Sequence, residues 1–138
     1  MDRRAFLATT GAALAVPVAG CTEGGLSEEE FDVGMSQNAY LPDTVEIPVG
    51  ETLVWGNNGS RGHTVTAYDG AIPDGTAFFA SGGYDSTDAA REEWNSGGGG
   101  NIDPGETFEH TFETAGEHSY FCIPHERNGM VGTVVVTE

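Results

Sequence analysis

The chain contains no lysine, and its only bases are five arginines among 138 residues. Aspartate and glutamate together number 22, which gives a formal net charge of −17 at pH 7. So acidic a surface repels phosphate backbones and excludes DNA and RNA as partners. Only two cysteines, Cys21 and Cys122, are present, which excludes a scaffold held by several disulfides. The apolar run at residues 5–19 is shorter than the roughly 20 residues that cross a bilayer comfortably.

Length and glycine content narrow the fold class. A chain of 138 residues has room for one domain of ordinary size. It contains 21 glycines, about double the usual share, which favours a turn-rich β protein over a helical bundle. Aromatic and β-branched residues recur at regular intervals, so most of the chain is expected to fold rather than remain disordered.

Residues 1–20 have the features of an export signal. The adjacent Arg3 and Arg4 precede a short apolar stretch, as in signals of the Tat pathway, which exports folded proteins. The stretch ends in Val-Ala-Gly before Cys21, which is typical of a lipobox, and Cys21 would then carry the lipid anchor. An ordinary signal with a coincidental cysteine is the alternative. We expect residues 21–30 to form an acidic flexible tether and the protein to lie on the extracytoplasmic face of the cell membrane.

The acidic residues spread along the whole chain beyond the signal. One-sided charge destabilises a compact state by self-repulsion, and molar salt screens it because the Debye length falls to about 3 Å. The composition therefore indicates adaptation to high salt; an acidic docking patch for a basic partner is the alternative. In molar salt, partner recognition would depend on short-range apolar contacts.

Short alternating or β-branched segments predict an all-β protein. Strands are expected at 30–35, 44–49, 52–55, 63–68, 106–112, 118–122 and 130–137, with turn sequences between them. One short helix is expected in an insertion at 69–105, capped by Ser86 and running through Trp94. Seven or eight short strands predict a Greek-key β-sandwich over residues 31–138.

Four side chains suggest a metal site. Cys122, His125 and Met130 follow a C-x2-H-x4-M pattern on a loop between two expected strands, and His63 would join them from a distant segment. One thiolate, two imidazoles and a weak thioether suit copper in one-electron transfer. Zinc accepts some of these donors but rarely recruits methionine. A Cys21–Cys122 disulfide is the structural alternative, although Cys21 would lie beyond the tether.

These residues resemble those of the plastocyanin-type cupredoxins. The resemblance covers residues 31–138 and rests on Val54-Trp55-Gly56-Asn57-Asn58 before His63, then Tyr120-Phe121-Cys122 and the loop. Acidity and the lipobox favour the halocyanin branch, the membrane-attached blue copper proteins of halophilic archaea. The resemblance implies one copper per chain, cycling between Cu(II) and Cu(I). His63, Cys122 and His125 would be the strong ligands and Met130 the axial one.

The resemblance also implies roles for neighbouring residues. Asn58 would tie the His63 loop to the cysteine loop, and Thr64 would fix the backbone beside His63. The electron would leave through His125 within an apolar patch that includes Ile123, Pro124 and Gly129. Plant plastocyanins carry an exposed tyrosine near the cysteine. Alternation here points Phe121 outward, and because Phe121 lacks a hydroxyl we do not expect a second electron route at that position. His110, His118 and Met35 are expected to be structural.

The function expected is that of a monomeric electron carrier, not an enzyme. Its partner would be a membrane redox complex, such as a terminal oxidase or a cytochrome. A copper delivery or storage module is the second hypothesis, and it would need rapidly exchangeable metal. A nitrite-reducing copper enzyme would need a second copper with several more histidines, which the sequence does not offer in a cluster. No Ser-His-Asp, Walker or dinucleotide motif is present.

Overall fold

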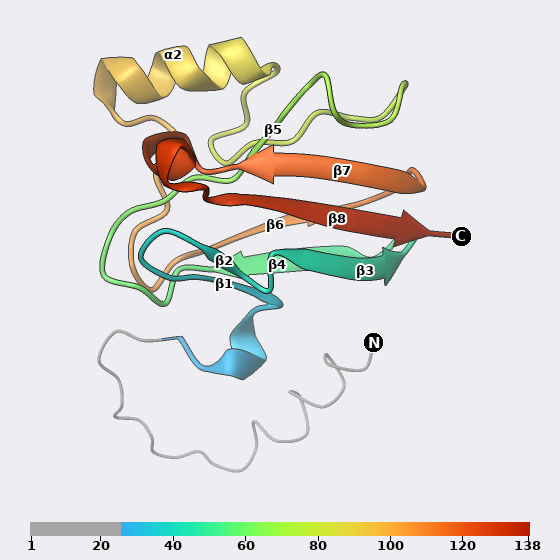
Figure 1. The fold of residues 1–138 in the computed structure, drawn as a ribbon, viewed down its shortest axis with the longest axis horizontal. Helices are drawn as coiled ribbons and strands as arrows, with labels where there is room; N and C mark the ends of the chain where they lie inside the picture. Colours follow the sequence, from blue (N-terminus) through green and yellow to red (C-terminus); the bar gives the residue numbers. More distant parts are fainter. Residues whose placement is uncertain (1–25) are drawn as a thin grey trace.

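The computed structural model describes residues 26–138 as two four-stranded sheets that face each other, with an α-helix to one side (Figure 1). The strands are β1 (Val33–Met35), β2 (Tyr40–Leu41), β3 (Thr44–Pro48), β4 (Thr52–Gly56), β5 (Thr66–Ala67), β6 (Thr107–Thr111), β7 (Gly116–Phe121) and β8 (Val131–Thr137). The predicted all-β sandwich of seven or eight strands with one short helix is confirmed.

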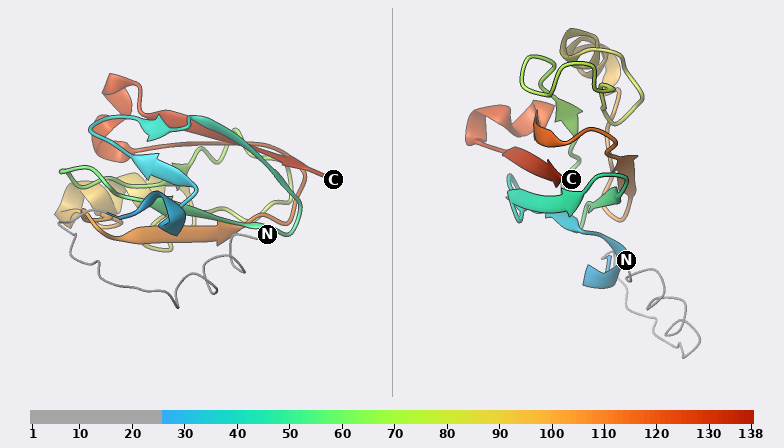
Figure 2. Two further views of the ribbon diagram at one scale, coloured as in Figure 1. Left: turned by 90° about the horizontal axis from the view of Figure 1, so that it is seen from below. Right: turned by 90° about the vertical axis from the view of Figure 1, so that its right-hand side faces the viewer.

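The strand order brings together segments that are far apart in the sequence. One sheet has the order β2-β1-β4-β6 and the other β3-β8-β7-β5. The pairs β1/β4 and β3/β8 are parallel, whereas β4/β6, β7/β8 and β5/β7 are antiparallel. Figure 2, right, looks along the strands and shows the two layers with α2 beyond them. β7, directly before Cys122, is paired with β5 and β8, and β8, which follows the loop after Cys122, is paired with β7 and β3.

An aromatic core fills the space between the sheets. Trp55 on β4 is fully buried, and its ring lies 5.3 Å from that of Tyr120 on β7 and 5.6 Å from that of Phe108 on β6. Tyr120 in turn packs on Gly132 of β8, where an added Cβ would come within 2.5 Å of the tyrosine ring. Contacts this close leave no room for a larger residue, so the core fixes β7 against β4 and β8.

The helix forms where its capping residue predicts. α2 (Thr87–Gly97) begins after Ser86, whose hydroxyl accepts a hydrogen bond from the Ala89 N–H at 3.0 Å. It runs three residues beyond Trp94 and ends at Gly98, which adopts a positive φ of 78°. Residues 1–25, including the predicted signal and Cys21, lie outside the described part. At the end of the predicted tether, η2 (Glu28–Glu30) forms one 3-10 turn.

Two strand predictions were inaccurate for a common reason. β2 was not expected, and the strand expected at 63–68 is reduced to β5, preceded by an isolated bridge between His63 and Ile102. Both features depend on pairing with residues distant in sequence, which local propensity does not report. Among residues 26–138, no helix has the length and apolar character needed to cross a membrane.

Candidate metal centre

The loop that carries His63 is closed by a buried asparagine. The Asn57 amide donates to the carbonyls of Arg61 at 2.7 Å and Ile102 at 2.8 Å, and its oxygen accepts from Gly59 N–H at 3.0 Å. His63 then exchanges two backbone hydrogen bonds with Ile102. These bonds fix the backbone on both sides of His63, which is fully buried.

The role predicted for Asn58 is wrong. Asn58 is exposed and makes no hydrogen bond among the described residues, whereas its neighbour Asn57 is fully buried and its side chain makes three. β4 ends at Gly56, so Asn57 is the first residue of the turn and faces inward, and Asn58 faces solvent. Asn57 also closes the His63 loop on itself and on Ile102 rather than on the cysteine loop.

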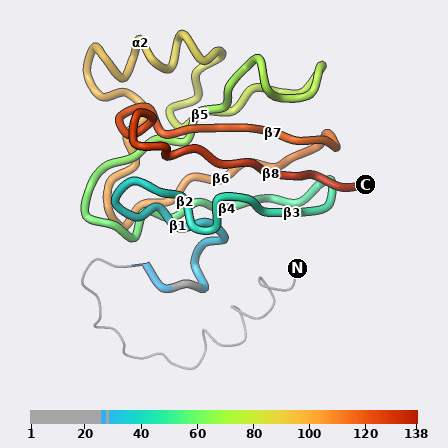
Figure 3. Tube along the Cα trace, in the orientation of Figure 1, coloured from blue at the N-terminus to red at the C-terminus, as the bar shows by residue number. Residues whose placement is uncertain are grey.

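The remaining candidate ligands lie on one tight loop after β7. Cys122 directly follows the strand as the N-cap of η3 (Ile123–Asn128), which turns the chain back through Gly129 with a φ of 87°. Cys122 N–H donates to the Met130 carbonyl at 3.0 Å, and Met130 N–H donates to the His125 carbonyl at 3.3 Å. The backbone itself therefore places Cys122, His125 and Met130 side by side. Figure 3 shows this loop at the same end of the molecule as the loop after β4.

Three donor atoms converge at this end. The Cys122 sulfur lies 3.6 Å from His63 Nδ1 and 3.4 Å from His125 Nδ1, and all three atoms lie within 4.8 Å of one another. The two imidazole rings are 4.8 Å apart between centroids. Met130, beside them through its backbone, is fully buried. The structure thus brings His63 to the cysteine loop, as the sequence predicts.

Thr64 connects the two ligand-bearing segments. Its N–H donates to the Cys122 sulfur at 3.3 Å, and its hydroxyl accepts from Ile123 N–H at 2.9 Å. Its carbonyl accepts from the Tyr40 hydroxyl at 2.7 Å. Thr64 therefore makes the connection that the sequence analysis assigned to Asn58.

We expect Thr64→Val to lower copper affinity about tenfold, within the range usual for groups that orient metal ligands. Valine keeps the shape and the N–H bond to sulfur but leaves Ile123 N–H without an acceptor. A competition titration with a chelator measures the change. Thr133→Val, on β8 next to β7, is the control and should leave the affinity unchanged. Equal affinities for the two variants would contradict the role of Thr64.

Burial sets the charge state of the donors. It raises the pKa of the Cys122 thiol to about 11, although the N–H of Thr64 partly offsets the effect. It lowers the pKa of His63 to about 4, with His125 acting in the same direction, and also lowers that of His125. Both imidazoles are therefore neutral at neutral pH and can ligate a metal ion. A bound metal cation would offset the cost of burying the negative charge of the Cys122 thiolate.

The donor set fits copper. Two imidazole nitrogens and one thiolate sulfur converge, with a methionine next to them, whereas zinc is usually held by four strong tetrahedral ligands. A bound copper would supply one-electron chemistry between Cu(II) and Cu(I). The protein would hold these ligands in one arrangement through the hydrogen bonds that the backbone N–H groups of Thr64, Cys122 and Met130 donate.

The predicted exit residues lie on the same loop as His125. His125 is 9% exposed, compared with 0% for His63, so it is the ligand histidine nearer to solvent. Ile123 and Pro124 are half-buried and Gly129 is exposed.

Phe121 requires a correction. It points away from the sandwich core, as alternation predicts, but it is not exposed to solvent: its exposed fraction is 0%. The Tyr68 ring stacks on it at 4.3 Å, and the Arg91 guanidinium lies 4.5 Å from its ring centroid. The insertion at 69–105 supplies Arg91 and covers this face, which the sequence alone did not reveal.

The other two histidines pack with aromatic rings. The His110 ring stacks on the Phe79 ring with 4.8 Å between centroids. His118 is 2% exposed, and its ring centroid lies 5.0 Å from that of Phe112. Its Nε2 is hydrogen-bonded to the Thr114 carbonyl at 2.9 Å. His118 thus faces inward as predicted, and neither residue belongs to the convergent donor set. Met35 is fully buried in the core, also as predicted.

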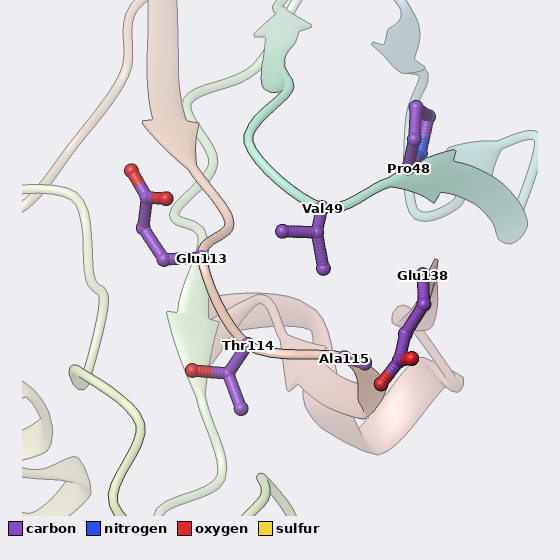
Figure 4. A pocket seen from close by; sticks show the side chains of 6 residues that line it. All are labelled: Pro48, Val49, Glu113, Thr114, Ala115 and Glu138. Carbon is purple, nitrogen blue, oxygen red and sulfur yellow. The ribbon is translucent and has the colours of Figure 1, made fainter.

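A pocket, shown from close by in Figure 4, lies where β3 and β8 end, away from the loop after β7 (Figure 1). Its lining consists of Pro48, Val49, Glu113, Thr114, Ala115 and Glu138. It contains neither histidine nor cysteine and plays no part in the site.

Fold and donor set together define a small copper protein of the β-sandwich class. The profile described as "Copper binding proteins, plastocyanin/azurin family" matches residues 28–137. Chloroplast plastocyanin from Tetradesmus obliquus is 32% identical over 125 residues, which cover 81% of this chain and 77% of the relative. The chain belongs to the plastocyanin/azurin family of cupredoxins.

Solved structures agree with this assignment. Amicyanin from Paracoccus versutus is 29% identical with a TM-score of 0.53, covering 75% of this chain and 77% of amicyanin. A purple cupredoxin from Nitrosopumilus maritimus is 25% identical with a TM-score of 0.50, covering 76% and 97%. Proteins of this family carry electrons and are not enzymes, and copper is their cofactor.

Proposed function

We propose that this protein is a blue copper electron carrier that exchanges single electrons with a membrane redox complex on the outer face of the cell membrane. One observation carries the proposal. His63 Nδ1, Cys122 Sγ and His125 Nδ1 converge within 4.8 Å at a buried point, on segments joined by backbone hydrogen bonds. Ligands held in this way change little when the charge of the metal changes, which favours fast one-electron transfer.

The sequence supports the cellular setting of this proposal. The twin arginine at Arg3-Arg4 and the lipobox ending at Cys21 favour Tat export and a lipid anchor. A net charge of −17 without lysine favours a high-salt medium. In this setting the protein would be a monomeric, membrane-attached carrier of the halocyanin kind, and a terminal oxidase or a cytochrome would be its partner.

The electron would pass through the exposed edge of His125. The ring of His63 has no exposed surface, so His125 is the better route to solvent. Ile123 and Pro124 supply apolar surface next to it, and a contact of this kind remains effective in molar salt.

The decisive test compares Ile123→Asp with the wild-type protein. Copper-loaded protein should show an intense blue band and a narrow copper hyperfine splitting in both cases, because Ile123 supplies no metal ligand. Electron transfer between the protein and washed membranes of the producing cell is measured by the bleaching or recovery of the blue band. The rate should be about tenfold lower for the variant, which corresponds to about 1.4 kcal/mol in free energy. The reason is that a carboxylate at the contact must lose its water.

Val49→Asp is the matched control, because Val49 is 42% exposed and directly follows β3, whose end lies away from the loop after β7 (Figure 1). It adds the same charge and should transfer electrons at the wild-type rate. Equal rates for the two variants would contradict the His125 face. A colourless copper-loaded wild type, or one stripped quickly by a chelator, would overturn the carrier proposal; the second result would favour copper delivery.

A further inference from the structure

The outer face of the second sheet carries a cluster that the copper site does not use directly. We call it the Arg91 cluster; it consists of Tyr68, Arg91, Phe121 and Glu126. The Arg91 guanidinium donates two hydrogen bonds to the Glu126 carboxylate, at 2.8 and 3.3 Å. The Tyr68 hydroxyl donates to the same carboxylate at 2.7 Å. Glu126 therefore accepts three hydrogen bonds from two other segments.

The same residues enclose Phe121. The Tyr68 ring stacks on the Phe121 ring at 4.3 Å, with an interplanar angle of 21°. Arg91 lies 4.5 Å from the centroid of that ring while it also binds Glu126. A guanidinium both stacked and bonded through two nitrogens has far less freedom than a surface arginine usually has.

Helix α2 holds Arg91 in this place from its first turn. Thr87 N–H donates to the Asp69 carboxylate at 2.9 Å, and Asp69 N–H donates to the Thr87 hydroxyl at 2.9 Å. The Thr87 hydroxyl also donates to the Ala67 carbonyl of β5 at 2.8 Å. Arg91 comes four residues after Thr87 and so lies on the same side of the helix. The start of α2 is thus fixed to β5, and its next turn faces the ligand loop.

Apart from Arg91, each member of the cluster is close in sequence to a candidate metal ligand. Phe121 directly precedes Cys122, and Glu126 directly follows His125. Tyr68 comes five residues after His63, directly after β5. The cluster therefore connects α2 to both segments that supply the convergent donors, the one that follows His63 and the loop that carries Cys122 and His125.

We propose that Arg91 is a positioning residue for the copper loop, and that the insertion at 69–105 serves to deliver it. By holding Glu126 and Phe121 together, Arg91 fixes the neighbouring His125 and Cys122 in the same place in both oxidation states of the metal. This inference rests on the proposed copper electron-carrier function of the same site.

A purely stabilising role does not explain the arrangement. The Arg91 and Glu126 side chains are 37% and 30% exposed, and ion pairs so near to solvent contribute little to folding stability, least of all in salt. The local consequence is larger, because Glu126 lies in a six-residue 3-10 turn whose position the bonds from Tyr68 and Arg91 help to fix.

The test compares Arg91→Met with Arg127→Met in the full chain loaded with copper. Arg127 lies one residue beyond Glu126, is exposed, and makes no hydrogen bond or ion pair among the described residues. Each variant loses one positive charge near the copper, so any difference between them reports the Arg91 contacts. We expect Arg91→Met to lose copper to a chelator about tenfold faster than Arg127→Met, as is usual when groups that orient ligands are removed. It should also show a shifted reduction potential and a wider copper hyperfine splitting.

If Arg91→Met does not fold, the milder variants Arg91→Lys and Tyr68→Phe test the same proposal. Lysine retains the charge but not the two-pronged bond, so copper loss should fall between wild type and Arg91→Met. Tyr68→Phe removes one bond to Glu126 and keeps the stacking, so the potential should shift in the same direction by less. Blue variants with the copper-loss rate, potential and hyperfine splitting of Arg127→Met would overturn the positioning role. A wild-type protein without a blue band would instead overturn the proposed function itself.

Discussion

Replacing Cys122 by serine is expected to abolish the blue colour of the copper-loaded protein completely. The colour would arise from charge transfer between a thiolate and copper, and Cys122 supplies the only sulfur within the convergent donor set of His63, Cys122 and His125. A serine hydroxyl does not ionise at neutral pH and is a poor ligand for copper. The two imidazoles would retain the metal weakly, with an affinity lower by more than about 100-fold. Visible absorption, EPR and a chelator titration measure these changes.

Cys21→Ser is the control for this experiment, since Cys21 and Cys122 are the chain's only cysteines. It should leave the blue band unchanged, and under the proposed lipid anchoring it should release the protein from the membrane fraction. An intense blue band in Cys122→Ser, or its loss in Cys21→Ser, would contradict the ligand assignment. A blue protein that stays on the membrane after Cys21→Ser would contradict the anchor alone.

Trp55→Ala is expected to destabilise the copper-free protein by about 3–5 kcal/mol, the range for removing a large aromatic side chain from a core. Trp55 is fully buried, and its ring lies 5.3 to 6.3 Å from four other aromatic rings, those of Phe79, Phe108, Phe112 and Tyr120. Domains of this size are stable by roughly 5–15 kcal/mol, so the loss is a large share of the total. Close packing leaves few ways for the neighbouring rings to fill the cavity.

Denaturant unfolding in molar salt measures this effect. The protein must be free of copper, because a metal bound only to the folded state adds stability of its own. Trp94→Ala is the control, since Trp94 is the second of the chain's two tryptophans and lies half-buried on α2. It should cost less than about 1 kcal/mol. Equal losses for the two variants would contradict the central place of Trp55 in the core.

Local features of the sequence were enough to predict the fold class and the loop that carries Cys122, His125 and Met130. The C-x2-H-x4-M spacing specifies a loop on which one turn brings Cys122, His125 and Met130 together, and the structure retains that loop as η3. Ser86 specified the start of α2 because a capping hydroxyl acts on a residue only three positions away. Alternation in β7 indicated correctly that Phe121 points away from the core and His118 into it.

The tertiary structure alone determined which distant residues contact these local segments. Which of two adjacent asparagines is buried depends on where β4 ends, and Asn57 rather than Asn58 reaches Ile102, 45 residues away. Whether Phe121 meets solvent depends on the insertion, whose Arg91 binds Glu126 across 35 residues. Sequence patterns report the periodicity of a segment and its short-range hydrogen bonds. Contacts between distant segments depend instead on how all the strands pack, and only the folded chain contains them.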